Sequence, residues 1–72
     1  YNQSVFRFGI GELYLQQNQP LDALQAFACA TQLDQRHVSA WASLGRLYEG
    51  HKQFKEALYC YREAVKHAKS KY

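Results

Sequence analysis

Apolar residues recur along this chain three and four positions apart, which is the spacing of one face of a helix rather than the alternation of a strand. Four such segments are separated by short polar stretches, so we predict an all-α fold with four helices. The first helix should run to about residue 17, and the others should cover about residues 20–33, 38–49 and 54–65. In the first helix this apolar face is predicted to be core. The apolar positions are Phe6, Ile10, Leu13 and Tyr14, then Ala23, Leu24, Phe27 and Ala30, then Trp41, Leu44, Leu47 and Tyr48, and then Phe54, Ala57, Leu58, Tyr61, Ala64 and Val65.

Residues with special backbone preferences stand where these helices would begin and end. Asn2 or Ser4 can cap the first helix, since a short side-chain oxygen accepts from the free amides of the first turn. Asn18 tolerates the left-handed conformation that a reversal needs, and Pro20 suits the first turn of the second helix because no amide donor is required there. Gly50 is expected to terminate the third helix. The helices should therefore form two hairpins with short turns.

The chain repeats itself with a period of 34 residues. Comparing residues 4–37 with 38–71 gives seven identities, where roughly two are expected by chance from ordinary residue usage. The identical pairs are Gly11/Gly45, Leu13/Leu47, Tyr14/Tyr48, Gln19/Gln53, Ala23/Ala57, Leu24/Leu58 and Ala30/Ala64. Small residues at Gly11 and Ala23, and at their counterparts, predict that the two helices of each hairpin approach closely.

The repeated pattern resembles the tetratricopeptide repeat (TPR), a helix-turn-helix unit with the signature Trp-x2-Leu-Gly-x2-Tyr, Ala-x3-Phe and a later Ala. The second copy carries it as Trp41, Leu44, Gly45, Tyr48, Ala57, Tyr61 and Ala64. The first copy has Arg7 in place of the Trp, and Gln35 and Lys69 stand where the family has a late proline. The resemblance implies an α-α superhelix of two units, residues 4–37 and 38–71, with four antiparallel helices. Two units are expected to be a fragment of a longer array.

The resemblance also implies a non-catalytic protein-interaction scaffold with a concave groove for a protein or peptide partner. For Phe8 and Leu15 two interpretations remain: packing against a preceding repeat, or contact with the partner. The uncovered ends of the two repeats would favour self-association. Because Phe8 and Glu12 stand where chaperone-binding relatives use Lys and Asn, we predict no binding of acidic chaperone tails. By position the groove would include Val5, Phe8, Glu12 and Leu15 from the first unit and Ser39, Ala42, Arg46 and Glu49 from the second.

A narrower likeness joins residues 11–27, 32–34 and 40–49 to the TPR arrays of histone H3 lysine-27 demethylases and of the related fungal general corepressor. It implies a nuclear chromatin regulator in which the array assembles the complex. Demethylation would belong to a separate Jumonji domain that uses Fe(II) and 2-oxoglutarate. The His-x-Asp/Glu pair of such oxygenases is missing here. We therefore expect no catalytic, cofactor or metal residues in this segment.

Charge suggests the other candidate functions. The net charge of +3 is uneven: residues 1–50 hold three basic and four acidic residues, and residues 51–72 hold six and two. One alternative is thus a basic helical module that contacts nucleic acid, although its aromatics recur at core positions of the repeat. Another is that the repeats brace a catalytic domain elsewhere in the parent chain. Cys29 and Cys60 are expected to be reduced thiols of an intracellular protein, and no membrane-spanning segment is predicted. The basic set is Lys52, Lys55, Lys66, Lys69 and Lys71, with Tyr61 and Tyr72.

Overall fold

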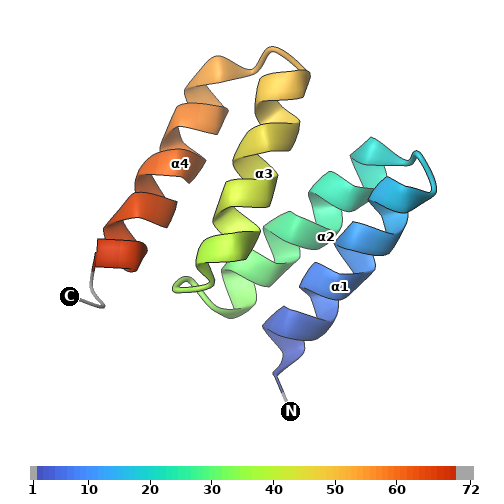
Figure 1. The fold of residues 1–72 in the computed structure, drawn as a ribbon, viewed down its shortest axis with the longest axis horizontal. Helices are drawn as coiled ribbons and strands as arrows, with labels where there is room; N and C mark the ends of the chain where they lie inside the picture. Colours follow the sequence, from blue (N-terminus) through green and yellow to red (C-terminus); the bar gives the residue numbers. More distant parts are fainter. Residues whose placement is uncertain (1, 70–72) are drawn as a thin grey trace.

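The computed structural model describes residues 2–69 and is all-α, as predicted. The helices are α1 (Gln3–Gln16), α2 (Pro20–Leu33), α3 (Val38–Gly50) and α4 (Phe54–Lys69). Each helix packs against the next one along the chain, and Figure 1 shows them as two hairpins side by side. No strand occurs within the described range. The last residues of the predicted second unit, 70 and 71, lie outside that range, as do Lys71 and Tyr72 of the basic set.

The two hairpin turns have the same backbone geometry, one period apart. Asn18 has a φ of 60° and Lys52 a φ of 63°. In both turns the residue after the left-handed one donates its amide to the carbonyl five residues before its own position, at 2.9 Å: Gln19 to Tyr14 and Gln53 to Tyr48. The prediction for Asn18 is confirmed, and α3 ends at Gly50 as predicted, although Gly50 does not adopt the left-handed conformation typical of a terminating glycine. Gly50 remains helical with a negative φ, because the reversal falls two residues later, in register with Asn18.

Ser4 ties the first turn of α1 to the end of α2. Asn2 is the N-cap, and its side chain accepts from the Ser4 amide at 2.8 Å. The buried Ser4 hydroxyl donates to the Ala30 carbonyl at 2.8 Å and lies 2.7 Å from Nδ1 of His37. Because the single hydroxyl proton goes to Ala30, the contact with His37 needs a proton on Nδ1.

Each hairpin closes with an aromatic ring over a glycine. A Cβ added to Gly11 would lie 2.6 Å from Cε1 of Phe27, and one added to Gly45 would lie 3.0 Å from Cε1 of Tyr61. Ala23 and Ala57 are buried, as a close approach of the paired helices requires. The glycines are thus needed to seat an aromatic ring, a contact that the pairing of small residues did not predict.

The buried core is formed by residues of α2, α3 and α4, and part of the predicted apolar face of α1 lies outside it. Phe6 is 50% exposed and Leu13 is 57% exposed, so half of the predicted apolar face of α1 is not core. The reason is position in the repeat. Ala40, one period after Phe6, is fully buried in α3, which packs on α2, whereas no described element precedes α1. The buried core cluster is Ala23, Phe27, Trp41, Leu44, Cys60 and Ala64.

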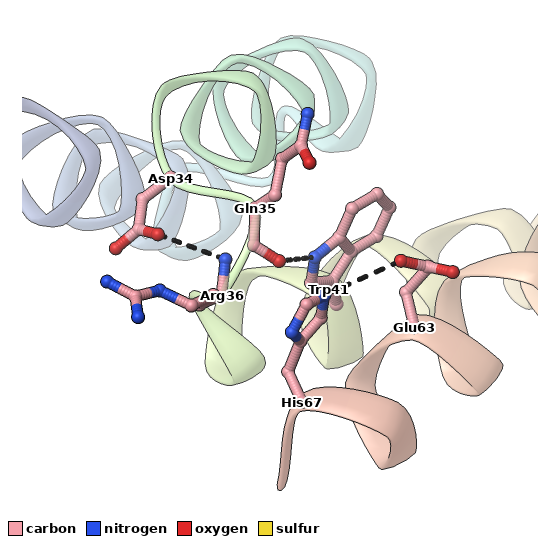
Figure 2. Close-up of polar contacts among 6 residues, drawn as sticks. All are labelled: Asp34, Gln35, Arg36, Trp41, Glu63 and His67. Atoms are coloured by element: carbon pink, nitrogen blue, oxygen red, sulfur yellow. Dashed lines mark hydrogen bonds and ion pairs between the residues drawn. The ribbon is translucent and has the colours of Figure 1, made fainter. Parts of the chain in front are cut away.

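Trp41 fixes the start of α3 to the linker between the hairpins. Its indole Nε1 donates to the Gln35 carbonyl at 2.8 Å, as Figure 2 shows. Within the linker, the Arg36 amide donates to the Asp34 side chain at 3.0 Å. On its other side the indole meets Tyr59 of α4 edge to face, with ring centroids 5.7 Å apart. One aromatic residue therefore connects the linker, α3 and α4.

Candidate partner-binding groove

A groove of about 270 Å³ opens between α1 and α3. Phe27 contributes from α2 and, being fully buried, lies at the base of the groove. The rim combines one carboxylate, one guanidinium and one hydroxyl with apolar side chains. The groove is lined by Glu12, Leu15, Phe27, Ser43, Arg46 and Leu47.

Three of the eight predicted groove residues line it: Glu12, Leu15 and Arg46. Sequence reasoning missed Phe27, which belongs to a second helix, and also Ser43 and Leu47. Leu47 is identical to the residue one period earlier, Leu13, so the repeat pattern predicted that it packs inside the fold rather than at the groove. The wall of the groove is thus partly made of residues that also serve the fold.

Phe8 packs within the fold. Its half-buried ring lies 5.4 Å from the ring of Phe27 and 5.0 Å from that of His37, measured between centroids. It therefore supports the base of the groove and the linker. Of the two residues that the sequence left open, Phe8 joins the hydrophobic core, and Leu15 remains exposed at the groove.

The other predicted positions lie outside the lining. Val5 and Ser39 are exposed, and Ala42 is half-buried. Glu49 is exposed and accepts a hydrogen bond from the Tyr61 hydroxyl at 2.9 Å. Glu49 is therefore engaged by α4 within its own hairpin.

Arg46 and Glu49 are three positions apart on α3, and both act on Tyr61 of α4. Partial burial and the hydrogen bond to Glu49 raise the pKa of Tyr61, and the Arg46 guanidinium acts on that pKa in the opposite direction. Arg46 therefore has a carboxylate as a neighbour on its own helix. No ion pair within the described range holds either Glu12 or Arg46.

The far side of α4 differs from the groove in charge and polarity. A shallow depression of about 390 Å³ is lined by Tyr61, Arg62, Val65 and Lys66. Leu58 and Val65 are more than half exposed there. This end of the molecule is therefore apolar and basic, while the groove contains both signs of charge.

The side chains offer little for chemistry. Burial, together with the carboxylates of Glu56 and Glu63, raises the pKa of the Cys60 thiol to about 11, so it is almost fully protonated near neutral pH. Among residues 2–69 no group of three or more His, Cys, Asp and Glu residues could hold a metal ion. Glu63 lies 3.6 Å from His67 one helical turn away, the other contact in Figure 2.

Two packed helix-turn-helix units define an α-α superhelix of the tetratricopeptide type. Residues 38–71 match the family model of the tetratricopeptide repeat, and a TPR is therefore present over that segment. Such repeats are in general non-catalytic modules for protein–protein interaction. No curated protein matches the chain.

No helix in the described part of the chain has the length and apolar character needed to cross a membrane.

Proposed function

We propose that this chain is a non-catalytic scaffold whose groove between α1 and α3 receives a peptide or helix of a partner protein. The observation that carries the proposal is the groove itself, with an apolar base and with charged rim residues that make no ion pair among the described residues. Polar groups at the rim and apolar ones at the centre are the usual composition of a recognition surface.

We further propose that residues 4–37 are also a TPR unit, the first along the chain. Three relationships support this: the seven identities, the left-handed residues 34 positions apart, and an aromatic ring over a glycine in each hairpin. The first is a property of the sequence, the second of the backbone and the third of side-chain packing, with Gly11 and Gly45 contributing to both the first and the third.

The exposed ends support an array of more than two units, or self-association. Thr31 is 1% exposed beneath the second hairpin, whereas Val65, one period later, is 54% exposed. The same position is thus covered in the first unit and open in the second. Open apolar end faces of a repeat protein are normally covered by a further repeat, a capping helix or another chain.

The particular setting we propose is a UTX-like regulator of chromatin in the nucleus. It is supported by the likeness of residues 11–27, 32–34 and 40–49 to the TPR arrays of histone H3 lysine-27 demethylases. Tagged chain expressed in cells should accumulate in the nucleus and co-purify with a chromatin-modifying complex. Recovery with cytoplasmic partners alone would contradict this setting and leave the scaffold proposal intact.

A crosslinking pull-down from nuclear extract tests the scaffold proposal. Leu15→Glu places a charge against the apolar groove without disturbing the core, since Leu15 is exposed, and should abolish capture of the partner. Lys55→Glu on the exposed surface of α4 is the control and should retain it. If Lys55→Glu or Lys66→Glu loses the partner and Leu15→Glu does not, α4 is the binding surface. Salt-sensitive nucleic acid in the captured material would then favour the basic-module alternative.

A further inference from the structure

The groove is small and shaped for one side chain. Its volume of about 270 Å³ lies below the roughly 300–1,000 Å³ of pockets that enclose a small molecule. Three of its six lining residues, Leu15, Phe27 and Leu47, are large and apolar. Such a site suits a single large apolar side chain presented by a chain that continues beyond the groove on both sides.

The charges of the groove differ from the charge of the molecule as a whole. The chain carries +3, whereas the groove lining holds one acidic residue, Glu12, and one basic residue, Arg46, with Glu49 next to Arg46 on α3 but outside the lining. Arg46 and Glu49 are three positions apart on α3, so their side chains are neighbours on one face of that helix, whereas Glu12 has no basic residue three or four positions away on α1. Glu12 is exposed on the opposite rim, and no described residue forms an ion pair with it. The charge that remains unbalanced at the rim is therefore negative and is carried by Glu12.

We propose that the groove recognises a partner segment in which a large apolar side chain stands next to a basic residue. The apolar side chain enters between Leu15, Phe27 and Leu47, and the basic residue meets Glu12. This inference rests on the proposed scaffold function and specifies its partner. It also gives a reason to expect acidic segments to be rejected, because they would meet Glu12 with like charge.

Selection of random peptides displayed on phage against the immobilised 72-residue chain tests the proposal. The enriched sequences should share a large apolar residue with Lys or Arg beside it. Selection against Glu12→Lys should replace the basic residue by Asp or Glu. Glu56→Lys makes the same charge change on the exposed surface of α4 and should leave the selected pattern unchanged.

Affinities of synthetic peptides make the test quantitative. With capped termini, replacing the apolar residue of a selected peptide by Ala should weaken binding by about 10-fold or more. Replacing its basic residue by Glu should weaken binding by about fivefold at low salt and less at high salt, as a rim charge does. Glu12→Lys should reverse that preference between the two peptides.

The outcomes separate the two levels of the proposal. An apolar consensus without any charge preference, or one unchanged by Glu12→Lys, would overturn the basic–apolar pattern and leave the groove as a binding site. Failure to select any peptide against a chain that circular dichroism shows to be folded would count against the scaffold function as well. Glu12→Gln, which keeps the shape of the side chain, should lie between wild type and Glu12→Lys.

Discussion

The ring of Phe27 lies so close over Gly11 that no side chain fits between them. An added Cβ would stand 2.6 Å from one ring carbon and within 2.9 Å of two more. Phe27 is fully buried, so its ring could be displaced only toward the groove that it lines. Gly11 is therefore the position where the smallest substitution should have the largest structural effect.

We expect Gly11→Ala to destabilise the fold by about 1–3 kcal/mol, the usual cost of overpacking. Gly9→Ala is the matched control, because a Cβ there meets nothing within 4 Å. It should stabilise the chain by about 0.5–1 kcal/mol through helix propensity. Urea denaturation with unchanged slopes measures both. Equal effects of the two substitutions would show that the ring is not fixed.

Replacing Lys52, the left-handed residue of the second hairpin turn, should stabilise the protein. A residue other than Gly or Asn at a φ of 63° is strained, and the equivalent Asn18 tolerates this conformation better. Lys52→Asn should raise the free energy of unfolding by about 1 kcal/mol. Lys55→Asn, in the first turn of α4, should lower it by about 0.5 kcal/mol or less. A loss of stability in Lys52→Asn would mean that the lysine side chain stabilises the turn.

The hydroxyl of Ser4 is buried and engaged twice, so its removal should be costly. Ser4→Ala removes one of two donors to the Ala30 carbonyl, which keeps the Asp34 amide, and removes the hydroxyl that the His37 ring nitrogen contacts, at a cost of about 1–3 kcal/mol. Ser39→Ala removes an exposed hydroxyl and should change stability by less than about 0.5 kcal/mol. Thermal unfolding of both variants compares them, and similar midpoints would refute the role of the hydroxyl.

Alkaline pH should destabilise the protein through Cys60. The thiol has a pKa of about 11 in the fold against 9.0 when unperturbed, so the unfolded chain loses this proton first. The contribution of this thiol to the free energy of unfolding is fully present below pH 9. It is lost as the pH rises toward 11, and the loss is at most about 2–3 kcal/mol. The raised pKa values of Tyr48 and Tyr61 act in the same direction.

Stability measured from pH 7 to 11 should therefore have a shallower alkaline slope in Cys60→Ala than in wild type. Cys29→Ala, which removes the other thiol, should retain the wild-type slope. Identical slopes in wild type and Cys60→Ala would show that the thiol ionises equally in both states.

Self-association through the exposed end of α4 is open to direct measurement. Leu58 and Val65 are more than half exposed on this face. Sedimentation should detect association that grows with protein concentration, and Leu58→Lys with Val65→Lys should suppress it without loss of helicity. A wild-type chain that stays monomeric at high concentration would argue against contact through this end.

The helices and their pairing could be predicted because periodicity and turn residues act locally. The same information failed at Phe6 and Leu13, since an apolar stripe does not reveal whether another element covers it. It found the end of α3 at Gly50 but not the left-handed residue of that turn, which is Lys52, one period after Asn18. The groove was predicted only in part, because Phe27 reaches it from another helix. Ser4 and His37 are 33 residues apart, and no local pattern joins them.

The bonds of Ser4 also bear on how the molecule folds. They join the beginning of one hairpin to the segment that leads into the next, so loss of the first hairpin also removes a contact that holds that segment. Neighbouring repeats can in principle melt separately. Here a hydrogen-bonded lock at the boundary couples them, and the two hairpins should unfold in a single cooperative step.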